Sequence, residues 1–169
     1  LRGEIVRMIP ALRAFAYTLT RNSVDADDLL QESLVKALAH IAQFVPGTNL
    51  KAWLFAIERN TYYTYYNKRR REALSVLEEA DGVQAEQGQD WSMRVKVVGE
   101  ALQQLPAQQR DALMLVGGAG LSYQEAAEVC GCALGTIKSR VNRGRIRLLE
   151  LLEVAPHMEF FETEDTWRR

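Results

Sequence analysis

A run of basic residues near the C-terminal end of the chain has the side-chain chemistry needed to bind DNA. It contains Lys138, Arg140, Arg143, Arg145 and Arg147, with no acidic residue among them. Guanidinium and ammonium groups donate hydrogen bonds to base edges in a major groove and to phosphate oxygens. The run therefore predicts a nucleic-acid interface, and a merely solvated basic helix is the alternative interpretation.

Helical geometry divides this segment into a core face and an outward face. At roughly 100° per residue, four residues lie within about 40° of one another and predict the core face: Ile137, Val141, Gly144 and Leu148. The opposite side, with its flanks, presents groups that can read base edges in a major groove: Lys138, Ser139, Asn142 and Arg143. Phosphate contacts, which add salt-dependent affinity without sequence information, are expected from Arg140, Arg145 and Arg147.

The residues before the basic helix have the pattern of a helix that ends in a tight turn. Ser122 and Glu125 have the spacing of a capping box, in which each side chain bonds a backbone N–H at the helix start. Ala126 and Ala127 are small enough for two helices to cross closely, and Gly131 can adopt the positive φ of a turn. A helix-turn-helix is therefore predicted, with the basic helix as its second helix.

The N-terminal half has the periodic apolar pattern of three amphipathic helices. The first presents apolar residues at three- and four-residue steps, namely Ile5, Met8, Ile9, Leu12, Phe15, Ala16 and Leu19. The second begins near residues 23–28, and we expect it to bury Leu30, Leu34, Ala37, Leu38, Ile41 and Phe44. The third can be capped by Thr48 or Asn49 and can run from Leu50 to about Arg71. These three helices predict an N-terminal bundle.

The composition changes between residues 75 and 92, where glycines and acidic residues replace the apolar pattern. This stretch predicts a flexible acidic linker between two small helical domains, residues 1–74 and residues 93–155. Residues 156–169 would form a C-terminal tail, to which we assign no role. No alternating strand pattern appears anywhere, so the predicted fold class is all-α.

Composition and the remaining motifs argue against several other classes of protein. The chain has no apolar run near the roughly 20 residues of a membrane helix and no signal-peptide pattern, so we expect a cytoplasmic protein without a membrane partner. Cys130 and Cys132 fit neither a zinc-ligand pattern nor a disulfide framework, so two core thiols and no cofactor are expected. Acidic Asp25, Asp27 and Asp28 are accompanied by no nucleophile or phosphate loop, which argues against an enzyme and a small-molecule substrate.

Together these motifs resemble bacterial extracytoplasmic-function (ECF) RNA polymerase sigma factors in order and spacing. The segment LSYQEAAEVCGCALGTIKSRVNRGRIRLLELL resembles their region 4.2, DADDLLQESLVKAL region 2.2, and FVPGTNLKAWLFAI region 2.3. The helix from Arg59 to Arg71 resembles region 2.4, and the whole resemblance covers residues 5–152. Details such as PGTNLKAWLF and CGCALGTIKSRVNR are most similar to the general-stress-response branch.

The resemblance implies a sigma factor that binds core RNA polymerase and directs promoter-specific transcription initiation, under the control of an anti-sigma factor. It implies that the polymerase clamp helices are contacted by Asp28, Gln31, Glu32 and Val35. It also implies that the minus-35 element is contacted by the four base-reading residues of the basic helix, Lys138, Ser139, Asn142 and Arg143. Single-stranded readout suits aromatic rings beside cations, so the minus-10 set is Asn49, Lys51, Arg59, Tyr62, Tyr63, Tyr66, Lys68 and Arg69. At least two of the tyrosines at positions 62, 63, 65 and 66 are expected to be packing residues.

The alternative function is a sigma-like mimic that sequesters an anti-sigma factor without reading promoters. Such a mimic is joined to a receiver domain, which nothing in this sequence resembles, and its DNA-facing residues need not be basic. Lys138 and Arg143 are basic here, which favours a promoter-reading protein. An ordinary dimeric repressor would need a ligand-binding or dimerisation domain that the N-terminal motifs do not resemble.

Overall fold

The computed structural model describes residues 1–75 and 93–152, and the described residues contain helices and connecting turns but no strand. This confirms the predicted all-α class. The chain divides into two compact units, Leu1–Gly88 and Gln89–Arg169. The predicted linker, apart from residue 75, and the predicted tail lie outside the described residues, so their boundaries and the flexibility of the linker stay predictions.

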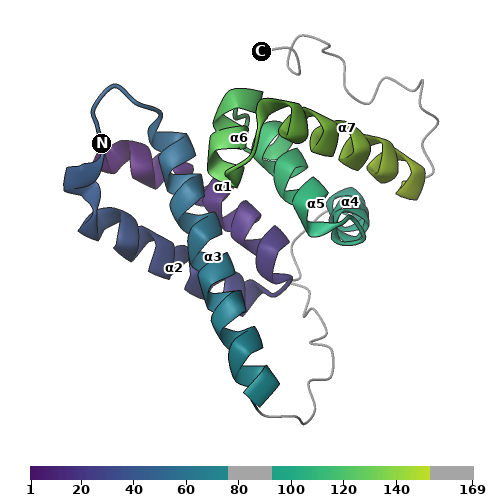
Figure 1. The fold of residues 1–169 in the computed structure, drawn as a ribbon, viewed down its shortest axis with the longest axis horizontal. Coiled ribbons are helices and arrows are strands. Elements are labelled where there is room, and N and C mark those ends of the chain that lie inside the picture. The colour runs from purple at the N-terminus through teal and green to yellow at the C-terminus, as the bar shows by residue number, and fades with distance from the viewer. Residues whose placement is uncertain (76–92, 153–169) are drawn as a thin grey trace. The chain divides into compact units, whose positions relative to one another are not determined.

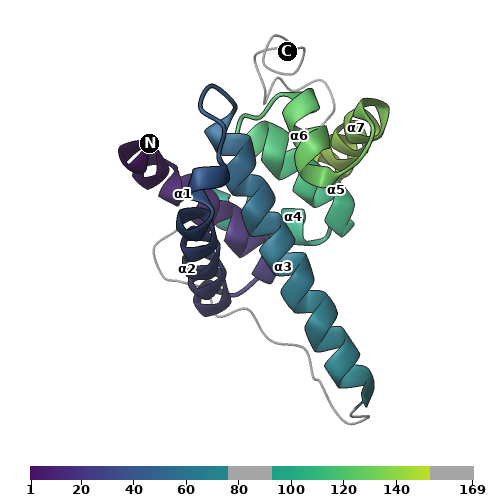
Figure 2. The same cartoon turned by 60° about the vertical axis from the view of Figure 1, so that its left-hand side comes forward.

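The first unit is a bundle of three helices, α1 (Arg2–Thr20), α2 (Ser23–Ala39) and α3 (Leu50–Ser75), with a short 3-10 turn at Ile41–Gln43. Figures 1 and 2 show the three helices packed against one another, with the C-terminal end of α3 projecting beyond the other two. The bundle core is apolar, and the rings of Phe15 and Phe55 meet edge to face within it.

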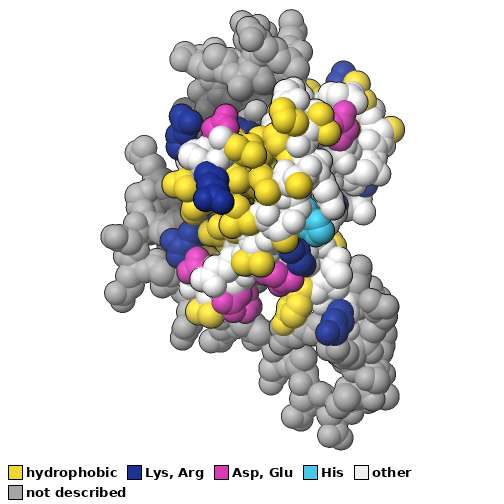
Figure 3. Space-filling model, turned by 90° about the vertical axis from the view of Figure 1, so that its left-hand side faces the viewer, with side chains coloured by type: hydrophobic (Ala, Val, Ile, Leu, Met, Phe, Trp, Pro, Cys, Tyr) yellow, Lys and Arg dark blue, Asp and Glu magenta, His cyan; other side chains and the backbone are white. Residues whose placement is uncertain are grey.

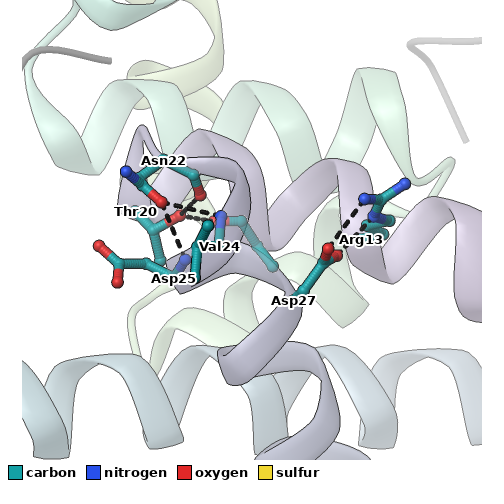
Figure 4. A network of polar contacts seen from close by, with 7 residues as sticks. Arg13, Thr20, Asn22, Val24, Asp25 and Asp27 are labelled. Atoms are coloured by element: carbon teal, nitrogen blue, oxygen red, sulfur yellow. Dashed lines mark hydrogen bonds and ion pairs between the residues drawn. The ribbon is translucent and has the colours of Figure 1, made fainter. Parts of the chain in front are cut away.

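The junction between α1 and α2 explains why α2 begins where it does. The side-chain oxygen of Asn22 accepts hydrogen bonds from the backbone N–H groups of Val24 and Asp25, at 2.8 and 3.0 Å (Figure 4). These are donors that a helix start leaves without intrahelical partners. Arg13 of α1 forms a bidentate pair with Asp27 of α2, at 2.6 and 3.0 Å. The hydrogen bond from Arg13 lowers the pKa of Asp27. Asn22 thus begins α2, and Asp27 ties this helix to α1.

One predicted core residue of α2 lies at the surface instead. The side of α2 that is buried comprises Ala26, Leu29, Leu30, Ser33 and Ala37. Leu38 is 51% exposed, so its predicted burial is wrong. The physical reason is that Leu38 lies about 100° around the helix from Ala37, and α2 ends one residue later, at Ala39. Ile41 and Phe44 follow α2 and are only half-buried.

The loop before α3 caps that helix. The backbone N–H of Ala52 donates to the side-chain oxygen of Asn49 at 3.1 Å, which selects Asn49 from the two predicted caps. The Thr48 hydroxyl donates instead to the carbonyl oxygen of Val45, at 2.7 Å. The cap fixes both the start of α3 and the orientation of the Asn49 amide.

A carboxylic acid is fully buried on α3. Glu58 has no exposed surface, and neither of its carboxyl oxygens has a hydrogen-bond partner among the residues that the structure describes. Burial raises the pKa of Glu58 to about 9, because a charged carboxylate loses its hydration there. Glu58 is therefore protonated and neutral at physiological pH.

The second unit contains α4 (Met93–Gln103), α5 (Ala107–Leu113), α6 (Tyr123–Cys130) and α7 (Leu134–Leu151). A π turn at Met114–Gly118 extends α5, where the N–H of Ala119 bonds the carbonyl oxygen of Met114 at 2.7 Å. The predicted core face of α7 is confirmed, because Ile137, Val141, Gly144 and Leu148 are its buried residues.

Gly144 allows α7 to pack closely on α5. A Cβ atom added at Gly144 would lie 3.2 Å from the backbone carbonyl oxygen of Gln109, which is tighter than an ordinary van der Waals contact. A larger side chain would push against backbone rather than against a movable side chain. Gly144 therefore sets how closely α7 packs on α5, and with it how far the outward face of α7 lies from α5.

Candidate nucleic-acid interface

The connection from α6 to α7 has the geometry of a helix-turn-helix. The capping box is complete: the Ser122 N–H donates to the Glu125 carboxylate at 2.7 Å, and the Glu125 N–H donates to the Ser122 hydroxyl at 3.2 Å. Ala126 and Ala127 are buried, and Gly131 has a φ of 62° at the end of α6. These three predictions are confirmed, and together they position the start of α7.

The outward face of α7 presents the predicted base-reading groups unequally. Lys138, Asn142 and Arg143 are exposed. Ser139 is half-buried, and its hydroxyl donates to the carbonyl oxygen of Thr136 at 2.9 Å. The hydroxyl proton of Ser139 is thus engaged within the helix, and its oxygen remains suited to accepting a hydrogen bond from a base. Two long cationic side chains, one amide and one hydroxyl acceptor form this face.

The predicted phosphate-binding residues lie toward the sides and the end of α7. Arg145 and Arg147 are exposed, and Arg140 is half-buried. Arg147 forms an ion pair with Glu150, at 2.9 Å between Nη1 and Oε2. Both partners are exposed to solvent, so the pair adds little stability and can exchange for a phosphate contact.

On α3, an aromatic and cationic cluster occupies part of the predicted minus-10 surface. The guanidinium carbon of Arg59 lies over the ring of Tyr63, and the rings of Tyr62 and Tyr63 meet edge to face at 5.2 Å between centroids. All three residues are half-buried, which fits the expectation that some of these tyrosines pack. We call Arg59, Tyr62 and Tyr63 the α3 cluster. It offers a ring surface beside a cation, the combination that suits stacking of unpaired bases.

The other predicted minus-10 residues lie before and after the α3 cluster along the chain. Asn49 is exposed beside the start of α3, and Lys51 is half-buried in its first turn. Lys68 is exposed toward the C-terminal end, and the side chains of Tyr66 and Arg69 lie outside the part that the structure describes. The predicted set thus follows α3 from its cap to Arg69, with the α3 cluster between.

The predicted polymerase-binding face is an exposed side of α2. Asp28, Gln31, Glu32 and Val35 are all exposed, and Glu32 pairs with Lys36 at 2.6 Å. An exposed apolar residue such as Val35 indicates an interaction site when other apolar residues surround it.

Val24 and Leu38 extend this face with apolar surface, although Val24 was given no role from the sequence and Leu38 was predicted to be buried. Val35 is 66% exposed, and Leu38 lies beside it, one turn later. Val24 is also exposed, near the start of the same helix. Hydrophobic side chains reach the surface on the side of the molecule where α1 begins (Figure 3). The three-residue step from Val35 to Leu38 could have identified Leu38 as a surface residue, because such residues lie on one helix face.

None of the helices described in residues 1–75 and 93–152 combines the length and apolar character needed to cross a membrane. Within the same residues, His, Cys, Asp and Glu side chains form no group of three or more that could hold a metal ion.

Comparison with known proteins connects both units to one family. The family model described as "Sigma-70 region 2" matches residues 5–72, and the one described as "Sigma-70, region 4" matches residues 96–148. The chain is 49% identical to the ECF RNA polymerase sigma factor EcfG of Rhodopseudomonas palustris, over 99% of this chain and 93% of that protein.

Solved structures agree with this assignment. The sigma factor RpoE of Bartonella quintana, in complex with the anti-sigma factor NepR, superposes with a TM-score of 0.81 at 45% identity, covering 90% of this chain and 96% of that one. The PhyRSL–NepR complex from Sphingomonas sp. Fr1 has a TM-score of 0.67 at 16% identity, covering 96% and 97%, and shares the fold alone. The resemblance inferred from the motifs is confirmed: this chain belongs to the extracytoplasmic-function family of RNA polymerase sigma factors.

Proposed function

We propose that this sigma factor binds core RNA polymerase through the exposed side of α2 and reads promoters through α7 and α3. The observation that supports this most directly is the division of α7 into two faces. One face is packed into the second unit, and the opposite face presents Lys138, Asn142 and Arg143 to solvent. A helix held in this way can enter a major groove without losing its own packing.

At the minus-35 element, Arg143 and Lys138 would donate to guanine, Asn142 would contact adenine, and Ser139 would accept from a base amino group. Arg140, Arg145 and Arg147 would hold the phosphates on either side, which positions the helix without selecting a sequence. The assignment of roles follows the exposure of the side chains and their place around α7.

At the minus-10 element, nontemplate bases would stack beside the α3 cluster, and Asn49 and Lys51 would contact DNA from the N-terminal end of α3. Tyr66, Lys68 and Arg69 would continue it toward the end of α3. The contact between Arg59 and Tyr63 supports this role, because it holds a cation and a ring in a fixed relation before DNA arrives.

An anti-sigma factor is the regulatory partner that we propose, with stress-response genes as the target. The support is similarity: the sigma factor of Bartonella quintana at 45% identity is solved in complex with the anti-sigma factor NepR. The setting would be the cytoplasm, where polymerase and promoter DNA meet, and the chain would act by binding rather than by catalysing a reaction of its own.

The alternative is a mimic that sequesters an anti-sigma factor without reading promoters. The PhyRSL structure has a similar fold, but its identity to this chain is only 16%, against 49% for a sigma factor. The exposed basic face of α7 also favours promoter reading, since a mimic has no use for base-reading donors.

Run-off transcription separates the two functions. Purified chain would be added to core RNA polymerase with a linear template that has minus-35 and minus-10 elements recognised by a general-stress-response sigma factor. We expect a promoter-specific transcript that depends on the added chain and disappears when either element is scrambled. A chain that binds polymerase or an anti-sigma factor, but yields no transcript, would favour the mimic.

A further inference from the structure

The only two cysteines of the chain lie in the turn of the helix-turn-helix. Cys130 is the last residue of α6, and Cys132 lies two residues before α7 begins, in the short connection between the helices labelled in Figure 1. The sequence predicted two core thiols, and this is wrong, because both residues are half-buried and keep part of their surface in solvent. Small reagents can therefore reach this turn.

The backbone brings the two residues to a separation that a disulfide can span. Gly131, between them, has φ 62° and ψ 41°, which is left-handed helical. In helical geometry of either hand, Cα atoms two residues apart are about 5.4 Å from each other. Disulfide-bonded residues usually have Cα atoms about 4.4 to 6.8 Å apart.

Gly131 also allows the turn to adjust. A Cβ added at Gly131 would meet nothing within 4 Å, so there is open space beside this residue. Glycine can leave the left-handed region at little steric cost, which lets the flanking residues turn their Cβ atoms toward each other. A one-residue spacer of any other type would resist this change more strongly.

The same turn determines how α7 is presented. The N–H of Cys132 bonds the carbonyl oxygen of Ala127 at 3.0 Å, and the N–H of Gly131 bonds that of Glu128 at 3.1 Å. Immediately afterwards, Thr136 and Ile137 bond the carbonyl oxygen of Ala133 as α7 starts. Closing a ring across Gly131 would disturb the first two bonds and shift the start of the helix that presents the base-reading residues.

We propose that Cys130 and Cys132 form a reversible dithiol–disulfide pair whose oxidation weakens promoter recognition by α7. The oxidant is a low-molecular-weight disulfide. One protein thiolate attacks it, forms a mixed disulfide and releases one small thiol; the second protein thiolate then attacks the protein sulfur and releases the other. The protein loses two protons and two electrons, and the small disulfide gains them as two thiols. The effect on promoters rests on the proposed function, whereas the chemistry of the pair does not.

The pair is tested by mass spectrometry of the full chain after incubation with oxidised glutathione. Because the chain has two cysteines, a loss of two hydrogens identifies one bond, between Cys130 and Cys132. We expect this product, reversed by dithiothreitol, while Cys130→Ser and Cys132→Ser stop at a glutathione adduct. Stable adducts on both cysteines, or crosslinked dimers in place of the bridge, would overturn the proposal.

The consequence is tested by run-off transcription with sigma factor that is oxidised first, freed of glutathione and then added to core polymerase. We expect the oxidised chain to give about tenfold less transcript, a loss comparable to that of one base contact, and dithiothreitol to restore it. The doubly substituted Cys130→Ser, Cys132→Ser chain should be insensitive to the same treatment. Equal transcription by bridged and reduced chains would overturn the regulatory part. Failure of the reduced chain to transcribe would instead count against the proposed function, and the mass measurement would still decide the bridge.

Discussion

The guanidinium of Arg59 lies 4.6 Å from the centre of the Tyr63 ring on the next turn of α3. The same ring also meets the ring of Tyr62 edge to face. The ring face of Tyr63 therefore contributes to the orientation of the cation, and phenylalanine at position 63 would keep that face.

Replacing Tyr63 by phenylalanine or leucine separates these contributions. Tyr63→Phe keeps the ring face and should open promoters nearly as well as the wild type. Tyr63→Leu removes the ring, and we expect a loss of about 1 to 3 kcal/mol in nontemplate-strand binding if a base stacks there. Binding of holoenzyme to a labelled minus-10 single strand measures both. Equal behaviour of the two variants would make Tyr63 a packing residue.

Arg143 and Arg147 should respond differently to the DNA sequence. Arg143→Ala should lower the affinity for the cognate minus-35 element by about 1 to 3 kcal/mol and relax the preference at one base pair. Arg147→Ala should weaken binding to all DNA sequences alike and reduce the salt dependence of binding. Holoenzyme binding to templates with single changes in the element, at two salt concentrations, gives the comparison. If Arg143→Ala lowered the affinity for every template equally, its role as a base reader would be contradicted.

Val35 and Leu38 should matter for polymerase binding and little for folding. Val35→Glu and Leu38→Glu place a charge on an exposed apolar surface, so the unfolding free energy should change by about 0.5 kcal/mol or less. The affinity for core polymerase should fall severalfold or more, measured by competition with a labelled sigma factor. Val6→Glu is the matched control, because Val6 is 62% exposed but lies on α1. If all three variants lose affinity equally, the exposed side of α2 is not a specific docking surface.

Glu58 should make the stability of the first unit fall as the pH rises. The pKa of Glu58 is about 9 in the folded unit, against 4.5 for an ordinary glutamate. Between these values the unfolded chain releases a proton that the folded chain keeps, so the unfolding free energy decreases, by at most about 1.4 kcal/mol per pH unit. Stability from this group is fully present below pH 4.5 and is lost as the pH approaches 9.

The variant Glu58→Gln tests this dependence. It has a similar shape and no titratable group, so it should match the wild type near pH 5 and become the more stable protein toward pH 8. Hydrogen exchange of α3 amides, corrected for the intrinsic rates at each pH, reports the first unit separately from the second. Parallel pH profiles for the two proteins would show that the Glu58 carboxyl does not titrate in this way.

Local features could be predicted from the order of residues because neighbours along the chain produce them. The capping box of Ser122 and Glu125 depends on a three-residue spacing, and the left-handed turn at Gly131 on the absence of a Cβ. The division of α7 into a core face and an outward face follows from the helical repeat. These rules were enough to predict that the base-reading residues lie on one side of one helix.

Tertiary packing decided what periodicity could not. Leu38 is exposed and Glu58 is buried because the neighbouring helices cover one side of α2 and one side of α3, and apolar character alone does not say which side that is. The half-buried cysteines depend in the same way on how closely other elements approach the turn. By itself the sequence determined the helices, their caps and the outward chemistry of α7, since those depend on residues a few positions apart. Only the tertiary structure decided which side chains meet solvent, because burial depends on neighbours that are distant in the chain.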